Sequence, residues 1–118
     1  MNEKIITLYG IKSCDSVRKA RKFLDNAEAA YHYHDFRVDG LTLDKLETWV
    51  AQAGWEKLLN TRSTSWRQLS DDDKSGLNGQ SAVQLMHANP TLIKRPVTEC
   101  NEQLFVGYKE AEFQENLL

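Results

Sequence analysis

The sequence predicts an α/β fold: a mixed four-stranded sheet that carries helices and a helical insert. Two observations lead to this prediction. Short apolar runs rich in β-forming residues stand near both ends of the chain, and each group of runs is accompanied by helix-like spacings of apolar residues. A long stretch between the two groups shows helical spacings instead. The expected order of elements is therefore β-α-β, a helical stretch, and then β-β-α.

The first unit begins with a short apolar run at residues 5–9, which stops at Gly10 and is typical of a buried strand. Residues 31–36 are rich in aromatic side chains and predict a second strand. Between the strands, apolar residues recur at helical spacing and mark one face of a helix: Val17, Ala20, Leu24 and Ala27. Such a β-α-β unit requires two parallel strands joined by a right-handed crossover.

The middle of the chain predicts several helices. Thr42 can cap a helix that ends near Gly54. Two apolar clusters within residues 55–69 suggest short helical turns, and we interpret the acidic run at 71–73 as a solvated face. A further helix should end near Asn89 because a proline follows it. Three tryptophans are expected to pack inside this segment: Trp49, Trp55 and Trp66.

The end of the chain predicts a hairpin and a closing helix. A strand is expected within residues 93–100, a turn at Asn101, and a partner strand at 103–106, and the short connection favours antiparallel pairing. Residues 109–118 suggest the last helix. The whole pattern is the outline of a thioredoxin-like fold, so we expect one domain over residues 1–118 with a helical insert at about 42–90.

Composition excludes several classes of protein. The 118 residues contain 15 Lys and Arg against 17 Asp and Glu, a net charge of −2, which argues against direct binding of nucleic acid. No apolar run approaches the ~20 residues that cross a bilayer, and no signal-peptide core is visible. The two cysteines cannot form a disulfide framework, so we expect a cytoplasmic protein. Nothing in the sequence demands more than a monomer.

Cys14 is the principal candidate for chemistry. It lies between the first strand and the first helix, where unpaired backbone N–H groups and the helix dipole favour a thiolate. Five basic residues fall within eleven positions around it: Lys12, Arg18, Lys19, Arg21 and Lys22. The structural alternative is a small buried side chain, as for most free cysteines. The motif lacks a second cysteine at Val17, so a redox cycle needs an external thiol or Cys100, which we expect to be structural.

Other candidate residues carry weaker signals. His32 and His34 alternate on one predicted strand, but a metal site would need a third ligand, so we expect ordinary histidines and no metal. Arg62 stands in a polar stretch and is a candidate contact for an anion.

Three segments together resemble the arsenate reductase (ArsC)/Spx family, and in particular its YffB-like branch. They are Tyr9-Gly10-x-x-x-Cys14, the stretch 58–62, and the stretch 89–96 that ends in Lys-Arg-Pro. The resemblance implies a thioredoxin-like fold with Cys14 as nucleophile. It places Arg62 and Arg95 at an anion site and makes Pro96 a cis-proline beside the cysteine. Lys12 and Arg18 would support the thiolate.

The resemblance also implies an oxidoreductase that binds no cofactor. Glutathione would act as reductant or cosubstrate, and glutaredoxin is a candidate second partner. Two departures predict weak or absent arsenate turnover. Gly10 stands where arsenate reductases of this type have a histidine, and only Lys109 is basic where they have a third arginine. The alternative is an Spx-like regulator that docks on RNA polymerase, although the Spx pair of cysteines is incomplete at Val17.

Overall fold

The computed structural model describes residues 4–118, and the chain divides into two compact units. The sheet unit consists of the residues up to Gly40 together with Arg95–Leu118, and the helical unit is Leu41–Lys94. The helical unit spans the segment for which the sequence predicts an insert. That the chain folds as a single domain stays a prediction.

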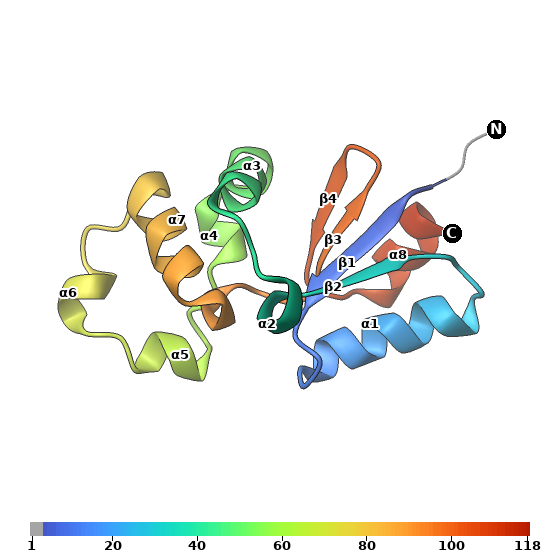
Figure 1. The fold of residues 1–118 in the computed structure, drawn as a ribbon, viewed down its shortest axis with the longest axis horizontal. Helices are drawn as coiled ribbons and strands as arrows, with labels where there is room; N and C mark the ends of the chain where they lie inside the picture. Colours follow the sequence, from blue (N-terminus) through green and yellow to red (C-terminus); the bar gives the residue numbers. More distant parts are fainter. Residues whose placement is uncertain (1–3) are drawn as a thin grey trace. The chain divides into compact units, whose positions relative to one another are not determined.

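The sheet unit contains a four-stranded sheet in the order β2-β1-β3-β4 (Figure 1). Its strands are β1 (Ile6–Gly10), β2 (His32–Asp35), β3 (Val97–Cys100) and β4 (Gln103–Val106). β1 pairs in parallel with β2 and antiparallel with β3, and β3 pairs antiparallel with β4. This arrangement confirms the predicted mixed sheet and the C-terminal hairpin.

Two helices cover one face of this sheet: α1 (Asp15–Asn26) and α8 (Glu110–Leu117) (Figure 1). The predicted apolar positions of α1 are buried, except Ala27, which lies just beyond the last helical turn. Burial of these side chains against the strands supplies the hydrophobic stabilisation of the unit. The shared core consists of Ile6, Leu8, Val17, Ala20, Leu24, Cys100, Phe113 and Leu117.

A short helix, α2 (Phe36–Asp39), follows β2 and corrects one prediction. The sequence predicted that Phe36 would continue the second strand. Instead, the Asp35 carboxylate accepts a hydrogen bond of 2.8 Å from the backbone N–H of Arg37, which caps a helical turn and ends the strand. Phe36 is buried all the same, so its apolar character did not distinguish strand from helix.

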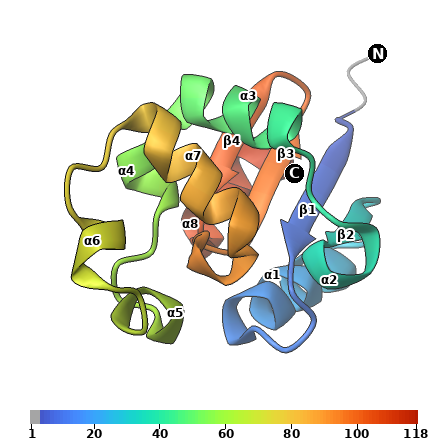
Figure 2. The same cartoon turned by 60° about the vertical axis from the view of Figure 1, so that its left-hand side comes forward.

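The helical unit contains five α-helices and one 3-10 helix among its described residues. Thr42 caps α3 by accepting a hydrogen bond from the backbone N–H of Lys45, and Gly54 ends it with a φ of +89°, as predicted. α7 lies beside α3 (Figure 2). Trp49 is fully buried, whereas Trp55 and Trp66 are half-buried. The helices are α3 (Leu43–Ala53), α4 (Trp55–Leu58), α5 (Thr64–Arg67), α6 (Asp71–Lys74), α7 (Gly79–Ala88) and η1 (Pro90–Leu92).

The predicted strand at 93–100 begins only at Val97. Ile93 pairs instead with Leu59 in an isolated β-bridge inside the helical unit. Pro96 has no backbone N–H to donate to a sheet, so the strand starts after it. The Arg95–Pro96 peptide bond is cis, as the family resemblance implied.

None of the helices formed by residues 4–118 is both long enough and apolar enough to cross a membrane.

Candidate active site

Cys14 occupies the turn that joins the carboxyl end of β1 to α1. Its backbone is extended, with φ −80° and ψ 127°, and it is the N-cap residue of the helix. The Cys14 N–H donates to the Ile11 carbonyl at 3.0 Å, and the Cys14 carbonyl accepts from the Arg18 N–H at 3.0 Å. These bonds close the turn on both sides of the cysteine. The residue is half-buried, in contrast to the buried Cys100.

The surroundings of the sulfur favour its ionised form. Burial opposes the charge, but the backbone N–H of Val17, the guanidinium of Arg95 and the backbone N–H of Ser16 outweigh it and lower the pKa of the Cys14 thiol. The sulfur makes no capping hydrogen bond of standard geometry, so the N–H groups act mainly through their dipoles. A thiolate is the nucleophilic form of cysteine, and this turn is therefore suited to nucleophilic chemistry.

Arg95 is the cation that favours the Cys14 thiolate, since its guanidinium lowers the pKa of the thiol. It precedes the cis-proline at the start of β3, the strand next to β1. The three predicted residues Cys14, Arg95 and Pro96 all belong to the sheet unit. Arg62 is an exposed residue of the helical unit, and its backbone N–H donates to the Asn60 side chain at 3.1 Å. Its contact with an anion at Cys14 stays a prediction.

The two predicted supporting cations differ in their surroundings. Lys12 is exposed, while Arg18 forms an ion pair with Asp15 on the surface of α1. Neither is among the groups that lower the pKa of Cys14. Their support of the thiolate stays a prediction, whereas Arg95 is among the groups that lower the pKa of Cys14.

Gly10 is tightly enclosed at the end of β1. A Cβ atom built there would lie 2.4 Å from Cγ2 of Val17, a distance that real Cβ contacts essentially never reach. The close approach of strand and helix thus requires glycine, and it sets the position of the first turn of α1. The same contact gives a physical reason why no larger side chain, such as the histidine of the arsenate reductase pattern, stands at position 10.

Asp35 is a buried carboxylate that sequence reasoning missed. Its oxygens accept from the Lys12 backbone N–H at 3.2 Å, the Tyr33 hydroxyl at 3.0 Å and the Arg37 backbone N–H at 2.8 Å. Burial opposes its charge, but these hydrogen bonds prevail and lower the pKa of Asp35. Burial and the bond to Asp35 raise the pKa of Tyr33 to about 12, so this hydroxyl remains a donor. The available signal was its residue type, because aspartate is favoured at helix N-caps and Asp35 caps α2.

The histidine pair does not form part of a metal cluster. The His34 ring packs on Tyr9 with 4.7 Å between ring centroids, and its Nε2 lies 2.6 Å from the Gly40 carbonyl. His32 is exposed. Among residues 4–118 no group of three or more His, Cys, Asp or Glu side chains is placed to hold a metal ion.

Cys100 lies at the other end of the sheet. It is 2% exposed within the core of the sheet unit and pairs with Ile6, the first residue of β1. Cys14 instead follows Gly10, the last residue of that strand. Four residue-to-residue steps along β1 separate its two ends, or about 13 Å at 3.3 Å per step. A disulfide needs its Cα atoms within about 7 Å, so a bond between the two cysteines would require rearrangement.

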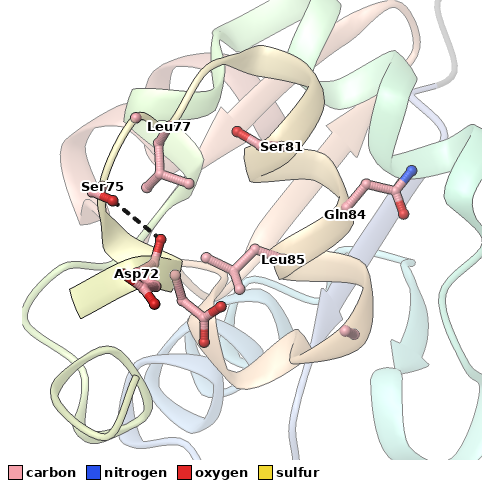
Figure 3. Close-up of a pocket in the computed structure, with 9 residues that line it drawn as sticks. Asp72, Ser75, Leu77, Ser81, Gln84 and Leu85 are labelled. Atoms are coloured by element: carbon pink, nitrogen blue, oxygen red, sulfur yellow. Dashed lines mark hydrogen bonds between the residues drawn. The ribbon is translucent and has the colours of Figure 1, made fainter. Parts of the chain in front are cut away.

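The helical unit has a pocket of its own (Figure 3). It has a volume of about 440 Å³ and is lined by α6, α7 and the segment that connects them, with Asp72, Leu77, Ser81 and Leu85 among its residues. The Ser75 hydroxyl donates to the Asp72 carbonyl at 3.2 Å on its rim. The lining holds no cysteine or other strong nucleophile, so the chemistry of this chain points to Cys14 instead.

Comparison with known proteins identifies related chains over nearly the whole length. A model of the ArsC family matches residues 9–116. An uncharacterized protein of Haemophilus influenzae is 44% identical over 110 residues, which cover 93% of this chain and 96% of that protein. The global transcriptional regulator Spx of Listeria innocua is 32% identical over 112 residues, which cover 93% of this chain and 85% of the regulator.

Solved structures agree with the match to the ArsC family model. The structure of the YFFB protein superposes with a TM-score of 0.93 at 39% identity and covers 96% of this chain and 99% of its own. The solution structure of an arsenate reductase (ArsC) related protein from Brucella melitensis gives a TM-score of 0.77 at 38% identity, with 96% of this chain and 94% of that one covered. With 96% of the chain covered, the likeness includes residues of both units.

Proposed function

Because the chain belongs to the ArsC family, we propose that it is a cytoplasmic, glutathione-dependent thiol–disulfide reductase with Cys14 as its single nucleophile. The observation that carries the proposal is the position of the Cys14 sulfur. It belongs to a half-buried residue at the start of α1, and backbone N–H groups and the Arg95 guanidinium lower the pKa of the thiol. Related chains include one named as arsenate reductase related, in keeping with redox chemistry.

The proposed reaction has three exchange steps, of which the first two involve Cys14. The Cys14 thiolate attacks one sulfur of a substrate disulfide, the S–S bond breaks, and the departing thiolate takes a proton from water. A glutathione thiolate then attacks the mixed disulfide at the substrate sulfur and releases the Cys14 thiolate. A second glutathione, or glutaredoxin, reduces the resulting glutathione mixed disulfide. Overall, two thiols are oxidised to one disulfide while the substrate disulfide is reduced to two thiols.

The arginines have separate proposed tasks. Arg95 stabilises the negative charge on the sulfur of Cys14 before attack and again when Cys14 leaves. Arg62, as the family resemblance implies, would contact an anionic group of the substrate. A guanidinium can bind a carboxylate through two parallel N–H donors, so carboxylate-bearing thiols suit such a site.

Arsenate is a less suitable substrate for this site. Its reduction requires several preorganised donors around a multiply charged oxyanion, and loss of one such donor can cost roughly 10²–10³ in rate. Val17 leaves no space for a side chain at Gly10. We therefore expect arsenate turnover with glutathione and glutaredoxin to be very weak or absent, and robust turnover would contradict this account.

Mass spectrometry of the protein incubated with oxidised glutathione tests the proposal. We expect one glutathionyl adduct at Cys14, its absence in Cys14→Ser, and its retention in Cys100→Ala. Alanine is the suitable control at position 100, because a serine hydroxyl would be buried without a partner at a cost of about 1–3 kcal/mol. Failure of accessible Cys14 to form any adduct would contradict the reductase proposal.

A second candidate function is that of a regulator that docks on RNA polymerase. The observation that favours it is the 32% identity with the global transcriptional regulator Spx over 93% of this chain. Cys14 lacks the partner cysteine that a redox switch within the motif would use, because Val17 stands there. Co-purification with RNA polymerase by a Cys14→Ser variant that forms no adduct would favour docking over catalysis.

A further inference from the structure

A cationic pocket adjoins the Cys14 turn on the β2 side of the sheet unit. It has a volume of about 550 Å³, within the ordinary range of small-molecule sites. One wall comes from the turn before Cys14, another from α1 and a third from α2. Its lining includes Ile11, Lys12, Arg18, Arg21, Arg37 and Val38.

The pocket combines positive charge with an apolar surface. Four of its side chains are cationic, and its one carboxylate, Asp35, is already occupied by three hydrogen bonds. Val38 is 81% exposed, which is unusual for a large aliphatic side chain. Arg18 is paired with Asp15, but the side chains of Lys12 and Arg37 form no hydrogen bond or ion pair within residues 4–118. These two cations are thus free to contact a ligand.

The pocket is held in shape by internal contacts. Asp35 links two of its walls, because one oxygen accepts from the Lys12 backbone and the other from the Arg37 backbone. Arg21 donates to the Tyr31 hydroxyl at 3.1 Å and stacks over the Tyr33 ring at 4.0 Å. The backbone positions that carry Lys12 and Arg37 are thus fixed before a ligand arrives, so less entropy is lost in forming the pocket around an anion.

The position of the pocket complements that of Arg95. β1 lies between β2 and β3, so Arg95 approaches the sulfur from the β3 side while the pocket lies on the β2 side. Ser13, which lines the pocket, is the residue next to Cys14. An extended tripeptide spans up to about 10 Å, a length that suits a ligand reaching from Cys14 into a pocket whose lining includes the neighbouring Ser13.

We propose that this pocket is a subsite for the carboxylates of a small peptide thiol or disulfide whose sulfur reacts at Cys14. Lys12 and Arg37 contact the carboxylates, and Ile11 and Val38 pack against the apolar part of the ligand. The assignment rests on the proposed thiol chemistry for its biological meaning, but binding in the pocket needs no reaction. The subsite selects carboxylate-bearing thiols over neutral or cationic ones.

Binding of S-methylglutathione, which cannot exchange, tests the subsite directly. The probe is titrated into the Cys14→Ser protein and followed by NMR chemical shifts. We expect the double substitution Lys12→Gln and Arg37→Gln to raise the dissociation constant about 10-fold, the order expected for two exposed charge contacts. The matched control, Lys19→Gln with Lys22→Gln, removes the same charge from an exposed part of α1 outside this pocket. Equal weakening by both double variants, or none by the first, would overturn the proposal.

Rates of adduct formation separate the subsite from the reductase proposal. In the Cys100→Ala background, the Lys12 and Arg37 substitutions should slow reaction with oxidised glutathione about 10-fold. Reaction with neutral hydroxyethyl disulfide should change less than about 2-fold, since that probe carries no group for the cations. If the protein reacts with both disulfides and the Lys12 and Arg37 substitutions slow both reactions equally or neither, the subsite is refuted and the reductase proposal stands. If the protein reacts with neither disulfide, but S-methylglutathione binding is weakened by the Lys12 and Arg37 substitutions and not by the control substitutions, the reductase proposal is refuted and the subsite is supported.

Discussion

The two ends of β1 place the two cysteines of this chain in opposite chemical environments. At the carboxyl end, Cys14 is half-buried at a helix start, and backbone N–H groups and a guanidinium surround its sulfur. At the amino end, Cys100 lies in the apolar core among residues of α1 and α8. Both residues carry the same thiol, so the difference in expected reactivity comes from the ends of the elements that hold them. Cys14 is therefore suited to chemistry because its thiol ionises readily, whereas Cys100 serves packing because it is excluded from water.

The largest expected effect is the difference in alkylation rate between the two thiols. In the native protein at pH 7, Cys14 should react with iodoacetamide at least about 10²-fold faster than Cys100. Cys100 is 2% exposed, so its reaction requires local or global opening, which costs several kcal/mol in a stable domain. Peptide mass spectrometry after timed labelling measures both rates.

Denaturant supplies the control for this contrast. In unfolded protein the two cysteines should react at similar rates, because the environment that distinguishes them is lost. Comparable rates in the native protein would show that the amino end of β1 opens readily, and would make Cys100 available as a resolving thiol after all.

The contrast was only partly predictable from the sequence. Apolar spacing and strand-forming runs are local, and they predicted the sheet, its flanking helices and the position of Cys14 at a strand–helix turn. The hydrogen bond from Lys12 to Asp35 joins residues 23 positions apart, and nothing local marks it. The pocket cations Arg21 and Arg37 likewise converge only when β2 lies beside β1. The resemblance, rather than periodicity, brought Arg95 into the predicted site.

The next largest effect concerns the close approach at the carboxyl end of β1. Gly10→Ala should destabilise the protein by about 1–3 kcal/mol, because its Cβ would overlap the Val17 side chain. Adding Val17→Ala should recover part of that loss, so the double variant should be less destabilised than the sum of the single changes. Urea unfolding of the four proteins measures the coupling.

A matched glycine distinguishes overlap from a general effect of losing glycine. Gly79 begins α7 and would place its Cβ 3.7 Å from the Trp55 ring, an ordinary contact. Gly79→Ala should therefore be neutral or slightly stabilising, since alanine is favoured over glycine in helices. Additive losses at Gly10 and Val17 would contradict the view that this contact sets the position of the Cys14 turn.

The smallest expected effect is a shift in the pH dependence of Cys14 alkylation in Arg95→Ala. Because its pKa is lowered in the folded protein, wild-type Cys14 should show a midpoint below the free-thiol value of about 8.5. Removal of the guanidinium should move the midpoint upward, slowing alkylation near pH 7 and leaving it unchanged near pH 10. Lys109→Ala, which removes an exposed cation elsewhere, is the control and should leave the midpoint in place.

The size of that shift weighs the two sources of thiolate stabilisation against each other. The backbone N–H groups of Val17 and Ser16 lower the pKa as well as Arg95, so the Arg95→Ala midpoint should rise only part of the way to the free-thiol value. The lowered pKa of Cys14 also makes the free energy of unfolding depend on pH. A thiol whose pKa is lower in the folded state adds stability as pH rises through that pKa, and the contribution is complete above the unfolded-state value. Arg95→Ala should therefore flatten the rise in unfolding free energy over this pH window, measured against Cys14→Ser. An unchanged midpoint in Arg95→Ala would assign the thiolate to the helix start alone. A complete return to the free-thiol value would instead make the guanidinium its sole cause.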